Sequence, residues 1–239
     1  MLVKFVQRCA RAAGFEINRS TPTSDRTAWL LGFCAAAGVT TILDVGANTG
    51  QFGNAMIAAG WRGRLVSFEP LSTAYARLVE SAARHPQWRV VPRTAVGARR
   101  QTAEINIAGN SQSSSLLPML ARHLSAAPTS GYVGTETVTV VPLDEALADA
   151  TAGECYMLKM DVQGFETEVL RGAAETMKRI AVIYTEMSLQ PLYSGEAMFT
   201  DLSRDIMALG YRCVGLQPGY ADAANREMLQ VDGVFVRNA

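Results

Sequence analysis

Residues 42–50 read ILDVGANTG, a short apolar strand that ends in an acid and runs into a glycine-rich turn. A helix is predicted directly after the turn, over residues 51–59. Strand-like and helix-like segments continue to alternate along most of the chain. This alternation predicts an α/β fold with a Rossmann-like, doubly wound, mostly parallel sheet. Residues 212–216 and 231–236 are expected to close that sheet as an antiparallel pair.

The glycine-rich turn is a candidate ligand site, because doubly wound sheets bind ligands beyond the carboxyl ends of their strands. Gly46 and Gly50 permit a tight turn and a close approach of the backbone to a ligand. The following helix N-terminus offers free N–H groups to a carboxylate, and Asp44 can help hold an ammonium group, directly or through water. A methionine-like ligand carries both groups, so the turn suits the amino-acid end of S-adenosylmethionine. A tight turn that binds nothing is the alternative.

Glu69 is the second candidate for this site. It ends the strand predicted over residues 65–68 and follows Gly46 at close to the spacing of about 20 residues expected for an acid that holds a ribose. Phe68 or Pro70 is placed to flank an adenine. A dinucleotide enzyme also uses a ribose acid, but its GxGxxG fingerprint does not match the turn, which reads GANTG. The P-loop pattern GxxxxGK[ST] is also absent from the sequence.

Residues 158–166, LKMDVQGFE, form a second unusual segment. Alternate residues of a strand share one face, so Lys159 and Asp161 are expected to point the same way. Because two charges in an apolar strand are costly unless paired, a structural ion pair is one interpretation. Asp161 also stands at the carboxyl end of its strand, where the fold places chemistry, and Glu186 ends the next strand in the same manner.

These three residues are the catalytic candidates. Asp161 is the first choice for a general base and Glu186 the second, while Lys159 tunes Asp161 or orients the acceptor. A divalent cation held jointly by the two acids is the other hypothesis, with no full set of metal ligands assigned. Residues 109–134 are the longest irregular stretch, interpreted as a mobile segment over the site or as an ordinary surface loop.

The chain resembles the FkbM family of S-adenosylmethionine-dependent methyltransferases over roughly residues 40–190. The resemblance lies in six segments that occur in the family's order: DVGANTG at 44–50, FEP at 68–70, SSL at 114–116, LDE at 143–145, KMDVQGFE at 159–166 and VLRG at 169–172. It implies the seven-stranded class I methyltransferase fold and methylation of an oxygen, often on a sugar or polyketide-derived scaffold.

The resemblance also implies which residues contact the cofactor, namely Asp44, Gly46, Asn48 and Glu69. From the same segments we add three further cofactor-binding candidates: Gly50, Phe68 and Ser115. Many relatives have histidine where Phe165 stands in this chain, so a role of that side chain is not carried over.

Composition narrows the choice of partners. The 22 basic and 22 acidic residues balance, which argues against a general nucleic-acid binder. Charged residues make up 18% of the chain, a low share that fits a small-molecule or glycolipid acceptor. The four cysteines form no CxxC or Cys/His cluster, and a reducing, cytoplasmic compartment is expected.

Residues 1–30 are predicted to form an N-terminal helical segment before a methyltransferase domain at 31–239. Lys4, Arg8 and Arg11 recur at helical spacing beside apolar residues. This pattern is typical of an amphipathic helix packed on the domain or of peripheral contact with an anionic membrane surface.

The sequence therefore predicts an S-adenosylmethionine-dependent O-methyltransferase acting on a hydroxyl of a sugar, glycolipid or polyketide-type acceptor. The alternatives are methylation of a non-sugar small molecule and a nucleotide-binding module without catalysis. Acids at two strand ends, Asp161 and Glu186, favour an enzyme, because a pure binder has no need of them. No oligomeric state is assigned.

Overall fold

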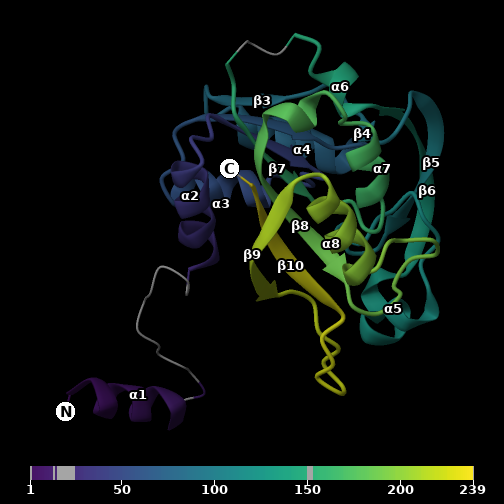
Figure 1. The fold of residues 1–239 in the computed structure, drawn as a ribbon. Coiled ribbons are helices and arrows are strands. Elements are labelled where there is room, and N and C mark those ends of the chain that lie inside the picture. Colours follow the sequence, from purple (N-terminus) through teal and green to yellow (C-terminus); the bar gives the residue numbers. More distant parts are fainter. Residues whose placement is uncertain (1, 13, 15–24, 150–152, 239) are drawn as a thin grey trace.

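The computed structural model describes residues 2–12, 14, 25–149 and 153–238, which form two sheets and their covering helices (Figure 1). The α-helices are α1 (Leu2–Ala12), α2 (Arg26–Ala36), α3 (Gln51–Ala58), α4 (Ser72–Ala82), α5 (Ala121–Ala126), α6 (Leu143–Ala146), α7 (Glu166–Arg171) and α8 (Phe199–Ala208). Two short 3-10 helices are η1 (Pro128–Ser130) and η2 (Thr176–Arg179). The strands are β1 (Thr41–Val45), β2 (Arg64–Phe68), β3 (Trp88–Val90), β4 (Ala95–Val96), β5 (Gln101–Ala108), β6 (Tyr132–Val141), β7 (Tyr156–Met160), β8 (Ile180–Ser188), β9 (Tyr211–Pro218) and β10 (Gln230–Arg237).

The larger sheet has seven strands in the order β3-β2-β1-β7-β8-β10-β9. The pairs from β3 to β8 are parallel, and β10 runs antiparallel to both β8 and β9. This order confirms the doubly wound, mostly parallel sheet and its closing antiparallel pair. The chain winds outward from β1 in one direction and returns to β7 on its other side. The switch point between β1 and β7 is where such sheets bind ligands.

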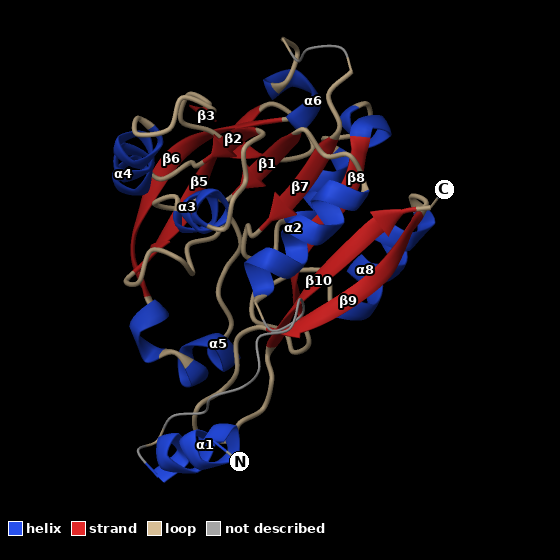
Figure 2. Cartoon of the chain, turned by 90° about the vertical axis from the view of Figure 1, so that its left-hand side faces the viewer, coloured by secondary structure: helices blue, strands red, loops and turns tan. Residues whose placement is uncertain are grey.

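Helices cover both faces of this sheet (Figure 2). Neighbouring residues of β1 show why: Ile42 packs in a cluster with residues of α2, α3 and α4, whereas Leu43 packs in one with residues of α7 and α8. Both side chains are completely buried. Because side chains alternate along a strand, an apolar residue at every position requires cover on both sides. The core therefore holds the strands rigidly and leaves their ends free to carry function.

The smaller sheet, with three strands in the order β4-β6-β5, was not anticipated as a separate unit. Its apolar side packs on α4 through a cluster that includes Ala74, Ile105 and Val140. The prediction of an irregular stretch over residues 109–134 is partly wrong, since α5 and η1 lie within it and β6 begins at Tyr132. A helix of six residues has too few turns to display a helical period in the sequence.

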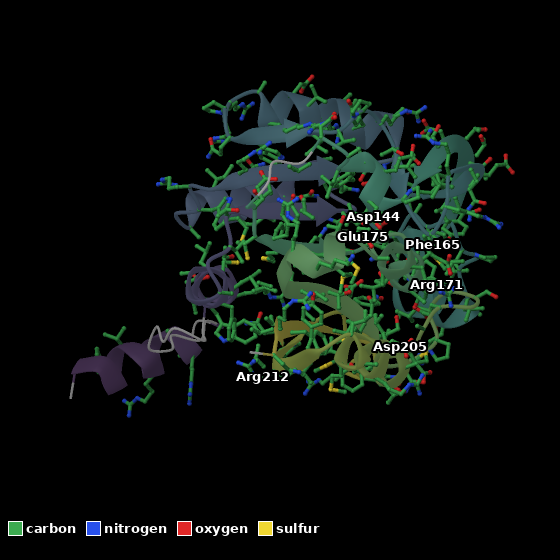
Figure 3. All side chains as sticks on the ribbon, turned by 45° about the horizontal axis from the view of Figure 1, so that its top comes forward. Asp144, Phe165, Arg171, Glu175, Asp205 and Arg212 are labelled. Atoms are coloured by element: carbon green, nitrogen blue, oxygen red, sulfur yellow. The ribbon has the colours of Figure 1, made fainter. Side chains whose placement is uncertain are left out.

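Two of the segments that resemble the FkbM family, residues 143–145 and 169–172, contribute to packing. Asp144 of α6 lies beside Glu175, as Figure 3 shows, and its carboxylate accepts hydrogen bonds from the backbone N–H groups of Glu175 and Thr176 at 2.9 and 2.7 Å. A Cβ atom on Gly172 would lie 2.0 Å from the carbonyl oxygen of Gly97. Asp144 thus joins α6 to the start of η2, and Gly172 packs the end of α7 against the residue that follows β4.

The N-terminal region contains two helices. In Figures 1 and 2, α1 lies apart from the sheets, with Phe5, Val6 and Arg8 exposed. The boundary expected at residue 30 falls inside α2, whose Leu30 and Cys34 are buried in the core. We therefore assign α2 to the sheet domain. Peripheral membrane contact, one of the two interpretations of this helix, stays a prediction. No helix among the described residues is long and apolar enough to cross a bilayer.

Candidate functional site

A cavity of about 700 Å³ opens at the carboxyl ends of the central strands. One part is lined by the glycine-rich turn after β1, by Phe68 at the end of β2 with Glu69 after it, and by β4. The other part is lined by the ends of β7, β8 and β10 and reaches to α5. The structure thus brings together most of the residues predicted from the sequence: Gly46, Asn48, Phe68, Glu69, Ser115, Lys159, Asp161 and Glu186 all line this one cavity.

The glycines of the turn are needed for packing. Gly46 has a φ of 77°, and a Cβ atom there would lie 1.9 Å from the carbonyl oxygen of Asp161. Gly50 has a φ of 90° and faces the ring of Trp88, to which a Cβ atom would approach within 2.9 Å. Gly50 does not line the cavity. The turn therefore requires glycine because it presses against β7 on one side and the β3 region on the other.

Asp44 does not reach the cavity, in contrast to the expectation that it helps to hold a ligand's ammonium group. It is fully buried, and its Oδ1 lies 3.1 Å from Nζ of Lys159, its neighbour in the sheet. Lys159 also donates a hydrogen bond of 2.8 Å to the carbonyl oxygen of Gly46. Burial alone would lower the pKa of Lys159, but the carboxylates of Asp44 and Asp161 outweigh it and raise that pKa. Lys159 thus ties the turn to β7.

Glu69 is nearly buried at the cavity wall. One carboxylate oxygen accepts a hydrogen bond from the backbone N–H of Asn48 at 2.7 Å, and the other from that of Leu71 at 2.9 Å. Burial raises the pKa of Glu69 to about 7 despite these bonds. A carboxylate has about four lone-pair sites, so two remain for ligand hydroxyl groups.

The serine-rich loop after β5 closes over the turn. Asn48, which has a φ of 47°, donates a hydrogen bond from its amide to Ser111 Oγ at 3.3 Å. Ser115 is buried, and its hydroxyl donates to the carbonyl oxygen of Gln163 at 2.7 Å and accepts from the N–H of Leu117. The loop is therefore joined to both β1 and β7. The hydroxyl of Ser115 makes both of these hydrogen bonds within the protein.

Gln163 joins the two catalytic candidates and was not singled out from the sequence. Its Nε2 donates to Asp161 Oδ1 at 2.8 Å and to Glu186 Oε2 at 2.9 Å. Its Oε1 accepts from the hydroxyl of Tyr193 at 2.7 Å. The side chain of Asp161 is 43% exposed, so of the two acids it is open to an incoming molecule.

A further acid follows on β10. Asp232 faces Glu186 across the sheet and pairs with Arg26 of α2 at 2.8 Å. Burial, together with the negative charges of Asp161 and Asp232, raises the pKa of Glu186 well above its ordinary value. Glu186 also accepts a hydrogen bond of 2.7 Å from Gln230. This end of the cavity therefore concentrates acidic and amide groups.

The sequence offered weak signals for these additional residues. Gln163 has a φ of 54°, a conformation that only the surrounding structure reveals. Gln230 and Asp232 are polar residues in a strand whose remaining residues are apolar up to Arg237, a pattern that could have drawn attention to them. No sequence pattern marked Arg26, because its partner Asp232 lies almost the whole length of the chain away.

Metal binding gains no support. Among the residues that the structure describes, no group of three or more His, Cys, Asp or Glu side chains is arranged to hold a metal ion. The amide nitrogen of Gln163 lies between the carboxylates of Asp161 and Glu186 and donates to both, at the position where a shared cation would have to lie.

The fold is that of the class I methyltransferases. Similar solved structures include the methyltransferase FkbM from Methylobacillus flagellatus KT, with a TM-score of 0.52 and 17% identity, covering 82% of this chain and 43% of that one. The methyltransferase domain of METTL16 has a TM-score of 0.50 and 10% identity, covering 94% of this chain and 73% of that one.

The family described as the methyltransferase FkbM domain matches residues 44–213, and this chain belongs to it. The 2-O-methyltransferase NoeI of Sinorhizobium fredii is 29% identical over 161 residues. That alignment spans 65% of this chain and 66% of NoeI.

Proposed function

We propose that the chain is an S-adenosylmethionine-dependent O-methyltransferase that methylates a hydroxyl group of a sugar or glycolipid acceptor. One observation carries the proposal: a single cavity joins the glycine-rich turn and Glu69 to the exposed carboxylate of Asp161. A relative named as a 2-O-methyltransferase, at 29% identity, supports oxygen as the acceptor atom.

The residues present fit S-adenosylmethionine. Glu69 retains free lone pairs at the cavity wall for ribose hydroxyls, and Phe68, Leu71 and Ile105 form an apolar lining beside it for a base. The backbone of the glycine-rich turn borders the same space and suits the methionine end. When bound, S-adenosylmethionine supplies a methyl group activated by its positively charged sulfur.

Asp161 is proposed as the general base. An alcohol is a weak nucleophile while protonated, so a carboxylate that takes the proton as the oxygen attacks lowers the barrier. Asp161 is the exposed acid of the pair, and Gln163 holds one of its oxygens. Glu186 is less suited, because its raised pKa keeps the carboxyl group protonated over more of the pH range. A protonated Glu186 can instead orient the acceptor by hydrogen bonding.

The acceptor end of the cavity suits a neutral, hydroxyl-rich molecule. It is lined by acids, amides and the aromatic rings of Phe52, Tyr184 and Tyr220. Acids and amides accept hydrogen bonds from hydroxyl groups, and aromatic faces pack on the apolar faces of sugar rings.

Methyl transfer from labelled S-adenosylmethionine to a panel of hexose methyl pyranosides tests the proposal. The free anomeric position is blocked in these probes, so any product is a methyl ether at another hydroxyl. We expect labelled product with at least one member. Binding of S-adenosylhomocysteine without transfer to any pyranoside would contradict a sugar acceptor, while no binding of S-adenosylhomocysteine would contradict the cofactor.

A further inference from the structure

One end of the cavity is formed by two facing rings. His123 lies on α5, and Tyr220 lies in the connection between β9 and β10. Their ring centroids are 5.9 Å apart, and both residues line the cavity. His123 is 3% exposed and packs edge-on against Tyr193. The two rings therefore belong to the wall of the site although their segments are about a hundred residues apart in the chain.

Both rings are connected to the catalytic candidates. Tyr193, which packs on His123, donates its hydroxyl hydrogen bond to Gln163, and Gln163 holds Asp161 and Glu186. The backbone carbonyl of Tyr220 accepts a hydrogen bond from the N–H of Gln230, whose side chain also holds Glu186. A molecule that contacts both rings from the cavity would thus share that cavity with the acids proposed for catalysis.

Each ring carries a buried polar atom without a hydrogen-bond partner. Across the described ranges, the buried side-chain atoms in this condition are Asp44 Oδ1, His123 Nδ1, Thr167 Oγ1 and Tyr220 Oη. Asp44 Oδ1 has an ion-pair partner in Lys159. Buried polar atoms in folded proteins are nearly always satisfied, because leaving them unpaired costs free energy. Two such atoms on facing rings of one cavity indicate a place where a ligand supplies the missing bonds.

The chemistry of the pair selects the kind of ligand group. Burial lowers the pKa of His123, so its imidazole is neutral and carries one donor and one acceptor nitrogen. Burial raises the pKa of Tyr220, so its hydroxyl stays protonated and can donate or accept. A hydroxyl group also does both and therefore complements the pair. A phosphate or carboxylate fits poorly, because the negative charge of Asp222 lies beside Tyr220.

We infer that His123 and Tyr220 bind hydroxyl groups of the acceptor other than the one that is methylated, and so select which hydroxyl reaches Asp161. This inference rests on the proposed function and deepens it by assigning specificity to two residues. It also accounts for the position of α5, a short helix that brings His123 to the cavity from the small-sheet side.

The chain has two histidines, His85 and His123, which makes the inference accessible to NMR. Protein labelled with ¹⁵N in its histidine rings would be saturated with S-adenosylhomocysteine and titrated with the methyl pyranoside that the wild type methylates best. We expect the ring signals of His123 to shift in proportion to occupancy. The signals of His85, which lies outside the cavity, serve as the internal control and should stay in place.

Two variants test the same point by kinetics. Tyr220→Phe removes only the hydroxyl, and His123→Phe removes both ring nitrogens. Each change should raise the KM for the same pyranoside about tenfold, the size expected for a lost hydrogen bond. The affinity for S-adenosylhomocysteine should not change. The Tm of Tyr220→Phe should be equal to or above that of the wild type, because an unpartnered buried hydroxyl is removed. Tyr75→Phe, the same change on α4 outside the cavity, is the matched control.

The outcomes separate the inference from the function on which it rests. Wild-type KM in both variants together with unmoved His123 signals would overturn the inference, while methylation by the wild type leaves the proposed function intact. A lower Tm for Tyr220→Phe with an unchanged KM would show a structural role and also overturn it. If the wild type methylates none of the pyranosides, the proposed function fails first and the inference fails with it.

Discussion

The two ends of the cavity differ in how fully their polar groups are satisfied. At the ends of β1 and β2, Asp44 is paired with Lys159, and Glu69 accepts two backbone hydrogen bonds. At the ends of β7, β8 and β10, acids crowd one another, and two buried ring atoms nearby have no partner. The first end is preorganised by its own contacts. At the second end, burial and neighbouring acids raise the pKa of Glu186, and the two ring atoms have no protein partner.

This difference predicts where substitutions in this chain are tolerated. The satisfied end depends on interlocking contacts of the backbone, such as Gly46 against Asp161, so a substitution at Gly46 is expected to disturb folding. The acceptor end is built from side chains of several segments, and its residues can be exchanged with less effect on the fold. The predictions below test this contrast, beginning with the largest expected effect.

Lys159→Met should lower the free energy of unfolding by about 3–5 kcal/mol, because it leaves the buried charge of Asp44 without its partner. Chemical unfolding followed by circular dichroism measures this loss. Lys178→Met is the control, since Lys178 pairs with exposed Glu175 at the surface and should change stability by less than about 1 kcal/mol. Equal stability of the two variants would contradict the structural role given to the Lys159–Asp44 pair. If Lys159→Met proves insoluble, adding Asp44→Asn should restore folding.

Asp161→Asn should reduce turnover at least about a hundredfold, the low end of the effect of losing a general base. The change keeps the shape of the side chain and removes its charge. Affinity for S-adenosylhomocysteine and the Tm should remain close to wild type, because Asp161 is partly exposed and takes no part in the core. A folded and fully active variant would rule out the catalytic role. Inactivation by chelator, reversed by an added cation, would revive the metal hypothesis.

Glu69→Gln should weaken binding of S-adenosylhomocysteine by about 1–3 kcal/mol, the usual cost of an unpaired buried hydrogen-bond partner. Calorimetric titration measures it. Glu80→Gln on the exposed side of α4 provides a matched control with no expected effect. Normal affinity in the Glu69 variant would exclude contact of this residue with the cofactor. We also expect a modest loss of stability in Glu69→Gln, because the amide has one oxygen to accept from the two backbone N–H groups that Glu69 binds.

Glu166 should make stability fall as the pH rises. Burial raises its pKa from the ordinary 4.5 to about 7, so the folded chain holds a proton that the unfolded chain releases. The stability from this proton is present below pH 4.5 and is lost as the pH passes from 4.5 to 7. The change is on the order of 1–2 kcal/mol between pH 5 and pH 7. Urea unfolding at several pH values should show a shallower decline for Glu166→Gln than for wild type, and an unchanged one for exposed Glu175→Gln.

Local sequence patterns were sufficient to predict much of the fold. The strand and turn at residues 42–50 predicted the switch point, and the alternation of segments predicted the parallel sheet with its antiparallel closing pair. Apolar runs and glycine turns are short-range features, and each specifies its own element without reference to distant residues. The candidate residues at strand ends followed from the same logic, because parallel strands bring their carboxyl ends to one edge.

Tertiary structure alone assigned partners to those residues. The sequence placed Lys159 beside Asp161 by strand periodicity, whereas pairing of β1 with β7 gives it Asp44 at 3.1 Å. Gln163 acquires its role from a left-handed backbone conformation and from Tyr193, and His123 contacts Tyr220 across about a hundred residues of sequence. Such contacts join segments that are far apart in the chain. Periodicity predicts which face of the sheet a side chain lies on. The residue beside it on that face depends on which strands are neighbours in the sheet.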